Sequence, residues 1–174
     1  AHVGRVFPIC SIKNFELAEN DPRRKEKGRY CFQGNEVKDN RGQYAVFAEL
    51  GAAPTNMEAN RLCDAYGMQI SEDESDPYVT EVGDADQAYT QATPSGTKTW
   101  LRLPLELQPA WWSKFRDPVV PMDRGLYGHP DAGGWWENHN EDKVVKEGFV
   151  RIENMPSVFW HDKLEIILIV YVDD

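Results

Sequence analysis

Two adjacent carboxylates, Asp173 and Asp174, follow a nearly continuous run of aliphatic and β-branched residues at 164–172. Such a run predicts a strand that is buried on both faces. It is far too short to cross a bilayer as a helix, which needs roughly 20 apolar residues. Carboxylate oxygens are the ligands that hard cations such as Mg²⁺ prefer. The pair therefore predicts a divalent metal site at the end of a strand, and the alternative is an acidic tail after a core strand.

A second candidate carboxylate, Asp84, follows β-branched residues within the stretch 78–89, which predicts another strand with an acid at its end. The order of three short motifs is informative: Asp84-x-x-x-Ala88-Tyr89, then Leu126-Tyr127-Gly128 with Trp136 beyond it, then Tyr171-Val172-Asp173-Asp174. Together they resemble the reverse transcriptase domain of copia-type retrotransposons. The resemblance extends upstream to Lys27-Gly28-Arg29 and so covers most of the chain.

The resemblance implies an RNA-directed DNA polymerase, a nucleotidyltransferase that adds deoxynucleotides to a DNA primer on an RNA template. In that reaction a primer 3′-hydroxyl attacks the α-phosphate of the nucleotide, and positioning and charge neutralisation do most of the work. Two Mg²⁺ ions roughly 3.5–4 Å apart, or Mn²⁺ in their place, require several converging carboxylates. The resemblance assigns this role to Asp84, Asp173 and Asp174. Asp86 is not part of the motif, and we expect it on the surface or in an outer shell.

The resemblance also implies a set of nucleotide-binding residues. Arg29 and Lys27 match a basic pair that reaches the triphosphate, for which the planar fork of arginine is well suited. Tyr89 matches an aromatic residue that packs beneath the sugar and excludes a 2′-hydroxyl; its alternative interpretation is a core tyrosine. The chain departs from the family after Gly128, where Leu-Lys-Gln-Ala-Pro-Arg is usual. Asp131 replaces the amide that would contact nucleotide or template, and a carboxylate near a triphosphate is electrostatically unfavourable.

The distribution of charge is uneven. The net charge is −10, whereas phosphate binding depends on Lys and Arg. Residues 1–45 hold nine basic and six acidic side chains, a balance of +3, against −13 over the rest of the chain. A basic N-terminal part is compatible with RNA template, DNA primer and deoxynucleoside triphosphates as partners. The three cysteines are widely spaced, which argues against a disulfide framework or zinc site and favours an intracellular protein with Cys10, Cys31 and Cys63 buried.

The length of 174 residues is that of one domain. We expect an α+β fold: a polymerase palm over about residues 51–174, with an antiparallel sheet and helices on one face, and a β-rich fingers part over about residues 1–50. The predicted fingers strand breaks near Pro8, and Asp21-Pro22 marks a turn. A helix starts after Thr55 or Asn56 and runs to about Tyr66. Its predicted inner face consists of Met57, Leu62, Cys63 and Tyr66.

Further elements are predicted downstream. Residues 99–104 favour a strand, 105–123 an irregular insertion and 131–146 a helix in which Trp136 anchors the core; 149–152 and 157–160 favour strands. The chain reads as a piece of a retrotransposon polyprotein without thumb or nuclease domain, inactive by itself. It would reside in a cytoplasmic particle or the nucleus, with no secretory leader or membrane span.

Two interpretations of a different class remain open. One is a catalytically inactive relic, or an acidic metal-binding or interaction domain, with the same fold. The other is a carbohydrate- or peptide-binding module built on exposed Trp111, Trp112, Trp135 and Trp136, because exposed aromatic rings provide stacking platforms. Burial of these tryptophans would exclude the module.

Overall fold

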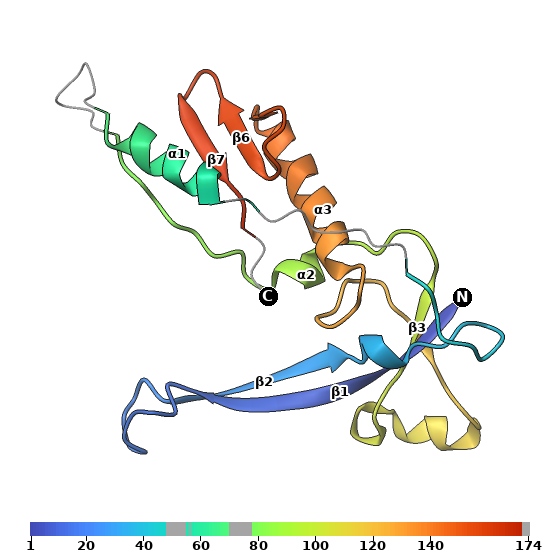
Figure 1. Cartoon of the computed structure of the whole chain (residues 1–174). Helices are drawn as coiled ribbons and strands as arrows, with labels where there is room; N and C mark the ends of the chain where they lie inside the picture. The colour runs from blue at the N-terminus through green and yellow to red at the C-terminus, as the bar shows by residue number, and fades with distance from the viewer. Residues whose placement is uncertain (48–54, 56, 70–77, 172–174) are drawn as a thin grey trace.

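The structure, a computed structural model, describes residues 1–47, 55, 57–69 and 78–171 (Figure 1). It contains two β-sheets and three α-helices in this part of the chain, which confirms the α+β class. Asp173, Asp174 and the acidic stretch 71–77 lie outside the described residues. No helix within the described ranges has the length and apolar character needed to cross a bilayer.

A long antiparallel hairpin extends away from the body of the molecule (Figure 1). It consists of β1 (His2–Lys13) and β2 (Lys25–Phe32), paired in continuous register from Val6 opposite Phe32 to Lys13 opposite Lys25. The prediction of a break at Pro8 is wrong, because β1 runs through it. Beyond Arg5 the strand pairs only with β2 among the described residues, and the N–H that proline lacks is tolerated on such an edge.

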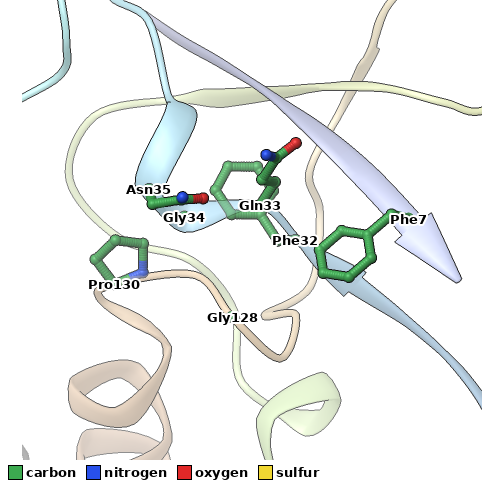
Figure 2. A pocket seen from close by; sticks show the side chains of 7 residues that line it. All are labelled: Phe7, Phe32, Gln33, Gly34, Asn35, Gly128 and Pro130. Carbon is green, nitrogen blue, oxygen red and sulfur yellow. The ribbon is translucent and has the colours of Figure 1, made fainter. Parts of the chain in front are cut away.

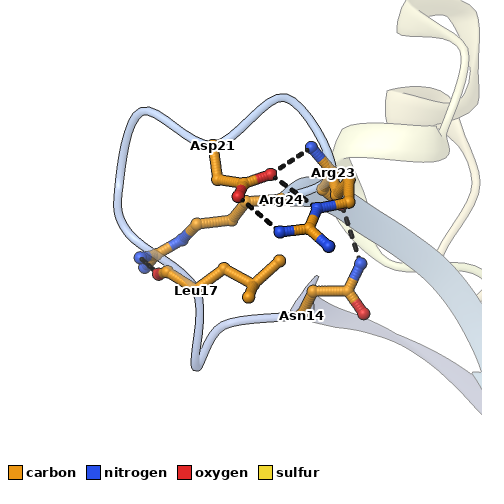
Figure 3. Close-up of polar contacts among 5 residues, drawn as sticks. All are labelled: Asn14, Leu17, Asp21, Arg23 and Arg24. Carbon is orange, nitrogen blue, oxygen red and sulfur yellow. Dashed lines mark hydrogen bonds and ion pairs between the residues drawn. The ribbon is translucent and has the colours of Figure 1, made fainter.

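The tip of the hairpin is a defined turn, as Asp21-Pro22 predicts (Figure 3). The Asp21 carboxylate accepts the backbone N–H of Arg23 at 2.9 Å and two guanidinium hydrogen bonds from the same residue at 3.0 and 2.9 Å. These bonds to Arg23 lower the pKa of the Asp21 carboxyl. Asn14, with φ 58°, donates its side-chain amide to the Arg23 carbonyl, and Arg24 donates to the carbonyl of Leu17. Local bonds therefore close the turn.

The base of the hairpin continues into a four-stranded sheet of order β2-β1-β3-β4. Strand β3 (Thr99–Arg102) runs parallel to the start of β1, and β4 (Val120–Pro121) runs antiparallel to β3. Three 3-10 helices complete this half: η1 (Gly34–Glu36), η2 (Leu105–Leu107) and η3 (Ala110–Lys114). The strand predicted at 99–104 and the irregular insertion after it are confirmed.

The hydrophobic core lies where this sheet meets the start of α3 (Ala132–Lys146). It contains Val6, Phe32, Val37, Ala92, Leu101, Met122, Ala132 and Trp135. Trp136 is buried as predicted. Since Trp112, Trp135 and Trp136 are all buried and only Trp111 of the four is exposed, the tryptophan-based carbohydrate- or peptide-binding module is excluded.

A second, antiparallel sheet of order β5-β6-β7 consists of β5 (Val150–Arg151), β6 (Val158–His161) and β7 (Ile166–Ile169). The predicted final strand exists, but it is not buried on both faces. Ile166 is exposed and the rest of β7 is half-buried, because β7 is the edge of the described sheet.

Helix α1 (Met57–Gly67) packs against β7, and the Tyr66 hydroxyl donates to the carbonyl of Glu165 at 3.1 Å. The helix is confirmed, whereas its predicted inner face is only partly right. Cys63 and Tyr66 are half-buried, and the Tyr66 ring also meets that of Trp160 on β6, whereas Met57 and Leu62 are exposed. The cysteine prediction also needs correction, since Cys31 is buried but Cys10 lies exposed on the hairpin.

Candidate functional site

The segment 124–131, which contains the Leu126-Tyr127-Gly128 motif, joins two distant parts of the chain. On one side the N–H of Gly125 donates to the carbonyl of Ala92, just after α2 (Ala88–Gln91), at 3.0 Å. On the other side the N–H of Phe32, the last residue of β2, donates to the carbonyl of Tyr127 at 2.7 Å. The segment thus places the hairpin next to the helical turn that follows Asp84.

Two glycines allow this close approach. A Cβ atom at Gly125 would overlap the carbonyl oxygen of Tyr89, and one at Gly128 would overlap the carbonyl oxygen of Phe32. Gly128 also has φ +88°, a conformation that side chains of L-residues rarely adopt. The spacing of the motif therefore has a structural reason. The backbone before Leu126 packs against the backbone of Tyr89, and the backbone after Tyr127 packs against that of Phe32, so neither glycine has room for a side chain.

Tyr127 connects two of the residues predicted to bind a nucleotide. Its ring meets that of Tyr89 edge to face, with 4.7 Å between centroids, and the Arg29 guanidinium carbon lies 5.6 Å from its centroid. Arg29 is exposed on β2, and Tyr89 is half-buried on α2. Lys27 is also exposed, and strand alternation places it on the same face as Arg29 but about 7 Å further along the hairpin. The structure thus brings Arg29 and Tyr89 together and leaves Lys27 apart.

An open cavity of about 590 Å³ lies beside this contact (Figure 2). The end of the hairpin and η1 form one wall, and the turn after Tyr127 forms the other. Its lining residues are Phe7, Phe32, Gln33, Gly34, Asn35, Gly128 and Pro130. The lining combines apolar rings with two side-chain amides and carries no charged side chain among the described residues. It suits a flat, uncharged group with hydrogen-bonding edges.

His129 holds the turn from inside the core. It is 4% exposed and lies within ring-contact distance of Phe32 and Trp135, with centroids 4.9 and 4.4 Å away. Its Nδ1 accepts the N–H of Asp131 at 3.1 Å, so the neutral ring carries its proton on Nε2, which lies 3.3 Å from the Thr99 hydroxyl. Burial lowers the pKa of His129 to about 4, with a smaller contribution from His2. The ring is therefore neutral at physiological pH.

Asp131 immediately precedes α3 and is only partly exposed. Its Oδ1 is buried and has no hydrogen-bond partner within the described part of the chain. Burial raises the pKa of the Asp131 carboxyl, and the nearby His2 opposes that rise. Asp131 is not one of the described residues that line the cavity, although its neighbour Pro130 is. The structure therefore places the predicted nucleotide contact, Asp131, next to the cavity, with one carboxylate oxygen that has no hydrogen-bond partner among the described residues.

The predicted metal ligands are not assembled in the described residues. Asp84 is exposed on an irregular segment that leads into α2, so the predicted strand that would carry it is wrong. Residues 78–87 form no strand in the described structure. Asp86 is exposed, as expected. Asp173 and Asp174 lie outside the described residues, and the described part of the chain contains no cluster of three His, Cys, Asp or Glu side chains suited to a metal.

Sequence reasoning missed the structural roles of Tyr127 and His129. Tyr127 could have been found, because it lies within a quoted motif between two glycines. His129 could not, since Thr99 and the surrounding rings come from other elements and show no spacing pattern with it. Comparison of the chain with protein-family models, curated proteins and solved structures finds no match.

Proposed function

We propose that the chain is the palm-and-fingers part of an RNA-directed DNA polymerase from a retrotransposon polyprotein. One observation carries the proposal: the ring of Tyr127 contacts both Arg29 and Tyr89. The two residues come from separate motifs, about 60 positions apart, that were assigned to the same nucleotide on sequence grounds alone. Their common neighbour, Tyr127, belongs to the Leu126-Tyr127-Gly128 motif.

The arrangement supports a division of roles around an incoming deoxynucleoside triphosphate. The exposed Arg29 would bind the phosphates, because its fork can donate two parallel hydrogen bonds while its guanidinium carbon lies 5.6 Å from the centroid of the Tyr127 ring. Tyr89, held by the same ring, would limit the space beside the sugar and so disfavour a 2′-hydroxyl. RNA template and DNA primer are the proposed partners, within an intracellular particle or the nucleus.

Divalent metal would be held by Asp84 together with Asp173 and Asp174. When bound, Mg²⁺ or Mn²⁺ activates the primer hydroxyl and stabilises the leaving pyrophosphate. Asp84 fits this role in one respect, since its exposed carboxylate lies four residues before the start of α2, the helix that carries Tyr89. Asp173 and Asp174 fit the role of metal ligands because carboxylate oxygens are the donors that Mg²⁺ prefers.

Primer extension tests the proposal. In the polyprotein that would contain this chain, Asp84→Asn and Asp173→Ala should abolish incorporation of deoxynucleotides on an RNA template. Asp86→Asn is the matched control, because it removes a neighbouring exposed carboxylate outside the motif. Near-normal incorporation by Asp84→Asn would remove Asp84 from the site. Equal extension by the parent and Asp173→Ala would reject the enzymatic assignment.

One observation favours an inactive relic as a second candidate. Asp131 keeps a partly buried carboxylate, without a hydrogen bond to Oδ1, beside the cavity and at the place where the family has an amide. A relic would retain the fold but give no extension above background in either the parent or the Asp131→Asn variant.

A further inference from the structure

A second surface with features of a binding site lies on the insertion after β3, on the side of the sheet away from α3 (Figure 1). Trp111 and Phe115 are 60% and 51% exposed, and their rings meet edge to face with centroids 6.0 Å apart. The Lys114 ammonium lies 5.7 and 5.4 Å from the two ring centroids. The neighbouring Trp112 is buried and anchors η3 to the body of the protein. The exposed rings of Trp111 and Phe115 therefore lie on an anchored helix and beside its end.

Positive charge is concentrated around Asp117, two residues after Phe115 in the sequence. Arg5 on β1 and Arg102 on β3 are direct partners in the parallel pairing, an arrangement in which like charges repel. Arg102 makes two hydrogen bonds to Asp117, at 2.7 and 2.6 Å. The bond to Arg102, with the nearby charges of Arg5 and Arg116, lowers the pKa of the Asp117 carboxyl. Arg102 is thus hydrogen-bonded to Asp117, and Arg5 and Arg116 lie near enough for their charges to act on the same carboxylate, in a chain of net charge −10.

We propose that this Trp111 surface, formed by Trp111, Phe115, Arg5, Arg102, Lys114 and Arg116, binds single-stranded nucleic acid. Single strands are bound by exposed rings on which bases stack, next to cations that contact the phosphates. Both components are present here, and the local charge is opposite to that of the rest of the chain. A duplex hides the faces of its bases, and an acidic protein segment would not need the rings, so a single strand matches both features.

The inference extends the proposed function, which supplies the identity of the strand as template RNA. The surface shares no residue with the Arg29–Tyr127–Tyr89 contact, and binding to it requires neither metal nor nucleotide. It can therefore be tested with the chain itself in EDTA, where nucleotidyl transfer is absent.

Binding of a fluorescent 12-nucleotide RNA single strand, measured by anisotropy at low salt, is the primary test. Trp111→Leu should weaken binding about 5- to 150-fold, the range that a single stacked base contributes, and Trp111→Phe should retain most of the affinity. Tyr44→Ala is the matched control, because it also removes an exposed ring next to a lysine, Lys38, whose ammonium lies 3.3 Å from the ring centroid. That variant should bind like the parent.

Charge is tested by salt dependence. Arg116→Gln should reduce the slope of log affinity against log salt by about 0.7, the value for one phosphate contact on a single strand. Lys146→Gln, an exposed cation at the end of α3, should leave the slope unchanged. Circular dichroism of each variant confirms that the fold is retained.

The inference would be overturned by equal affinity for an abasic strand of the same charge, by equal affinity for a duplex, or by unchanged binding of Trp111→Leu. Displacement of RNA by an equal charge of polyglutamate would instead assign the surface to an acidic protein partner and also reject it. Asp84→Asn separates the two proposals, since it should abolish primer extension in the polyprotein while leaving RNA binding by the chain intact.

Discussion

The ring of Tyr89 meets the ring of Tyr127 edge to face, with centroids 4.7 Å apart and an angle of 71° between their planes. This contact links α2 to the segment that is hydrogen-bonded to β2. Aromatic pairs in this geometry contribute about 0.5–1.5 kcal/mol beyond the area that they bury. The pair is therefore both part of the candidate nucleotide site and one of the contacts that hold its two sides together.

A double-mutant cycle should detect that coupling. We expect Tyr89→Leu and Tyr127→Leu to be non-additive by about 0.5–1.5 kcal/mol in the free energy of unfolding, measured by urea denaturation. Tyr89→Leu combined with Phe15→Leu, at the distant and exposed hairpin tip, should be additive. Additivity of the tyrosine pair would mean that the ring contact does not stabilise the fold.

Gly128→Ala should destabilise the protein by at least about 2 kcal/mol, because strain at positive φ alone costs 1–3 kcal/mol and the new Cβ meets the Phe32 carbonyl oxygen. Gly28→Ala is the matched control: Gly28 lies in β2, and a Cβ there meets no atom within 4 Å. That change should be neutral or stabilise by up to about 1 kcal/mol. Similar stabilities of the two variants would contradict the tight approach of the Tyr127 segment to β2.

His129 should make stability depend on pH between about 6.5 and 4. Its pKa is lowered to about 4 in the folded chain, so the unfolded chain binds more protons in this window and stability falls as the pH falls. The loss is at most roughly 3 kcal/mol, at 1.36 kcal/mol for each pH unit. Urea denaturation at several pH values measures it.

His129→Leu is the control for that measurement, because it removes the titrating group and fills the same apolar surroundings. Most of the slope should disappear in this variant, because the two remaining groups act in opposite directions: the lowered pKa of His2 reduces stability as the pH falls, and the raised pKa of the Asp131 carboxyl increases it. The carboxyls whose pKa values are lowered by hydrogen bonds, such as Asp21 and Asp117, lose their contribution at lower pH, below their ordinary pKa. A slope as large as that of the parent in His129→Leu would contradict the assignment to His129.

Asp131→Asn should increase both stability and nucleotide affinity at neutral pH. A raised pKa means that the folded state disfavours the ionised carboxyl, so a neutral amide of the same shape removes that cost and can also donate a hydrogen bond. Asparagine is also as good as aspartate at a helix N-cap. Urea denaturation and binding of a fluorescent deoxynucleoside triphosphate measure the two effects.

The pH dependence of this variant provides its internal control. The stability difference from the parent should shrink at low pH, where Asp131 is protonated in both folded and unfolded chains. Asp123→Asn, an exposed carboxylate near the same segment, should change neither quantity. Weaker nucleotide binding by Asp131→Asn would show that the carboxylate itself contributes to the site.

Local sequence signals predicted much of the secondary structure. The hairpin turn at Asp21-Pro22, helix α3 and the strands near 99–102 and 158–161 follow from turn residues and apolar periodicity, which act over a few positions. The prediction of a strand before Asp84 was wrong because strand formation depends on more than local sequence. Its β-branched residues favour extended backbone, but a strand also needs a neighbour, and the sequence does not say where one lies.

The candidate site was predictable in its parts but not in its assembly. Arg29 and Tyr89 were identified from the resemblance, and the chain geometry that brings them to Tyr127 depends on two glycines and a parallel pairing of β1 with β3. His129 shows no comparable signal, because the sequence does not show the partners that fix it. Those partners, Thr99 and Phe32, come from strands that only the folded sheet places beside it.

The backbone hydrogen bond from Phe32 to Tyr127 has a consequence for how the protein is made. A ribosome adds roughly 5–20 residues each second, so the hairpin emerges about 5–20 s before the residue that secures its base exists. Two strands without further support are marginally stable in water. During translation the β1–β2 hairpin therefore exposes the apolar side chains of Phe7, Ile9 and Ile12 before the rest of the fold supports it. We expect chaperones to bind the hairpin mainly in this interval.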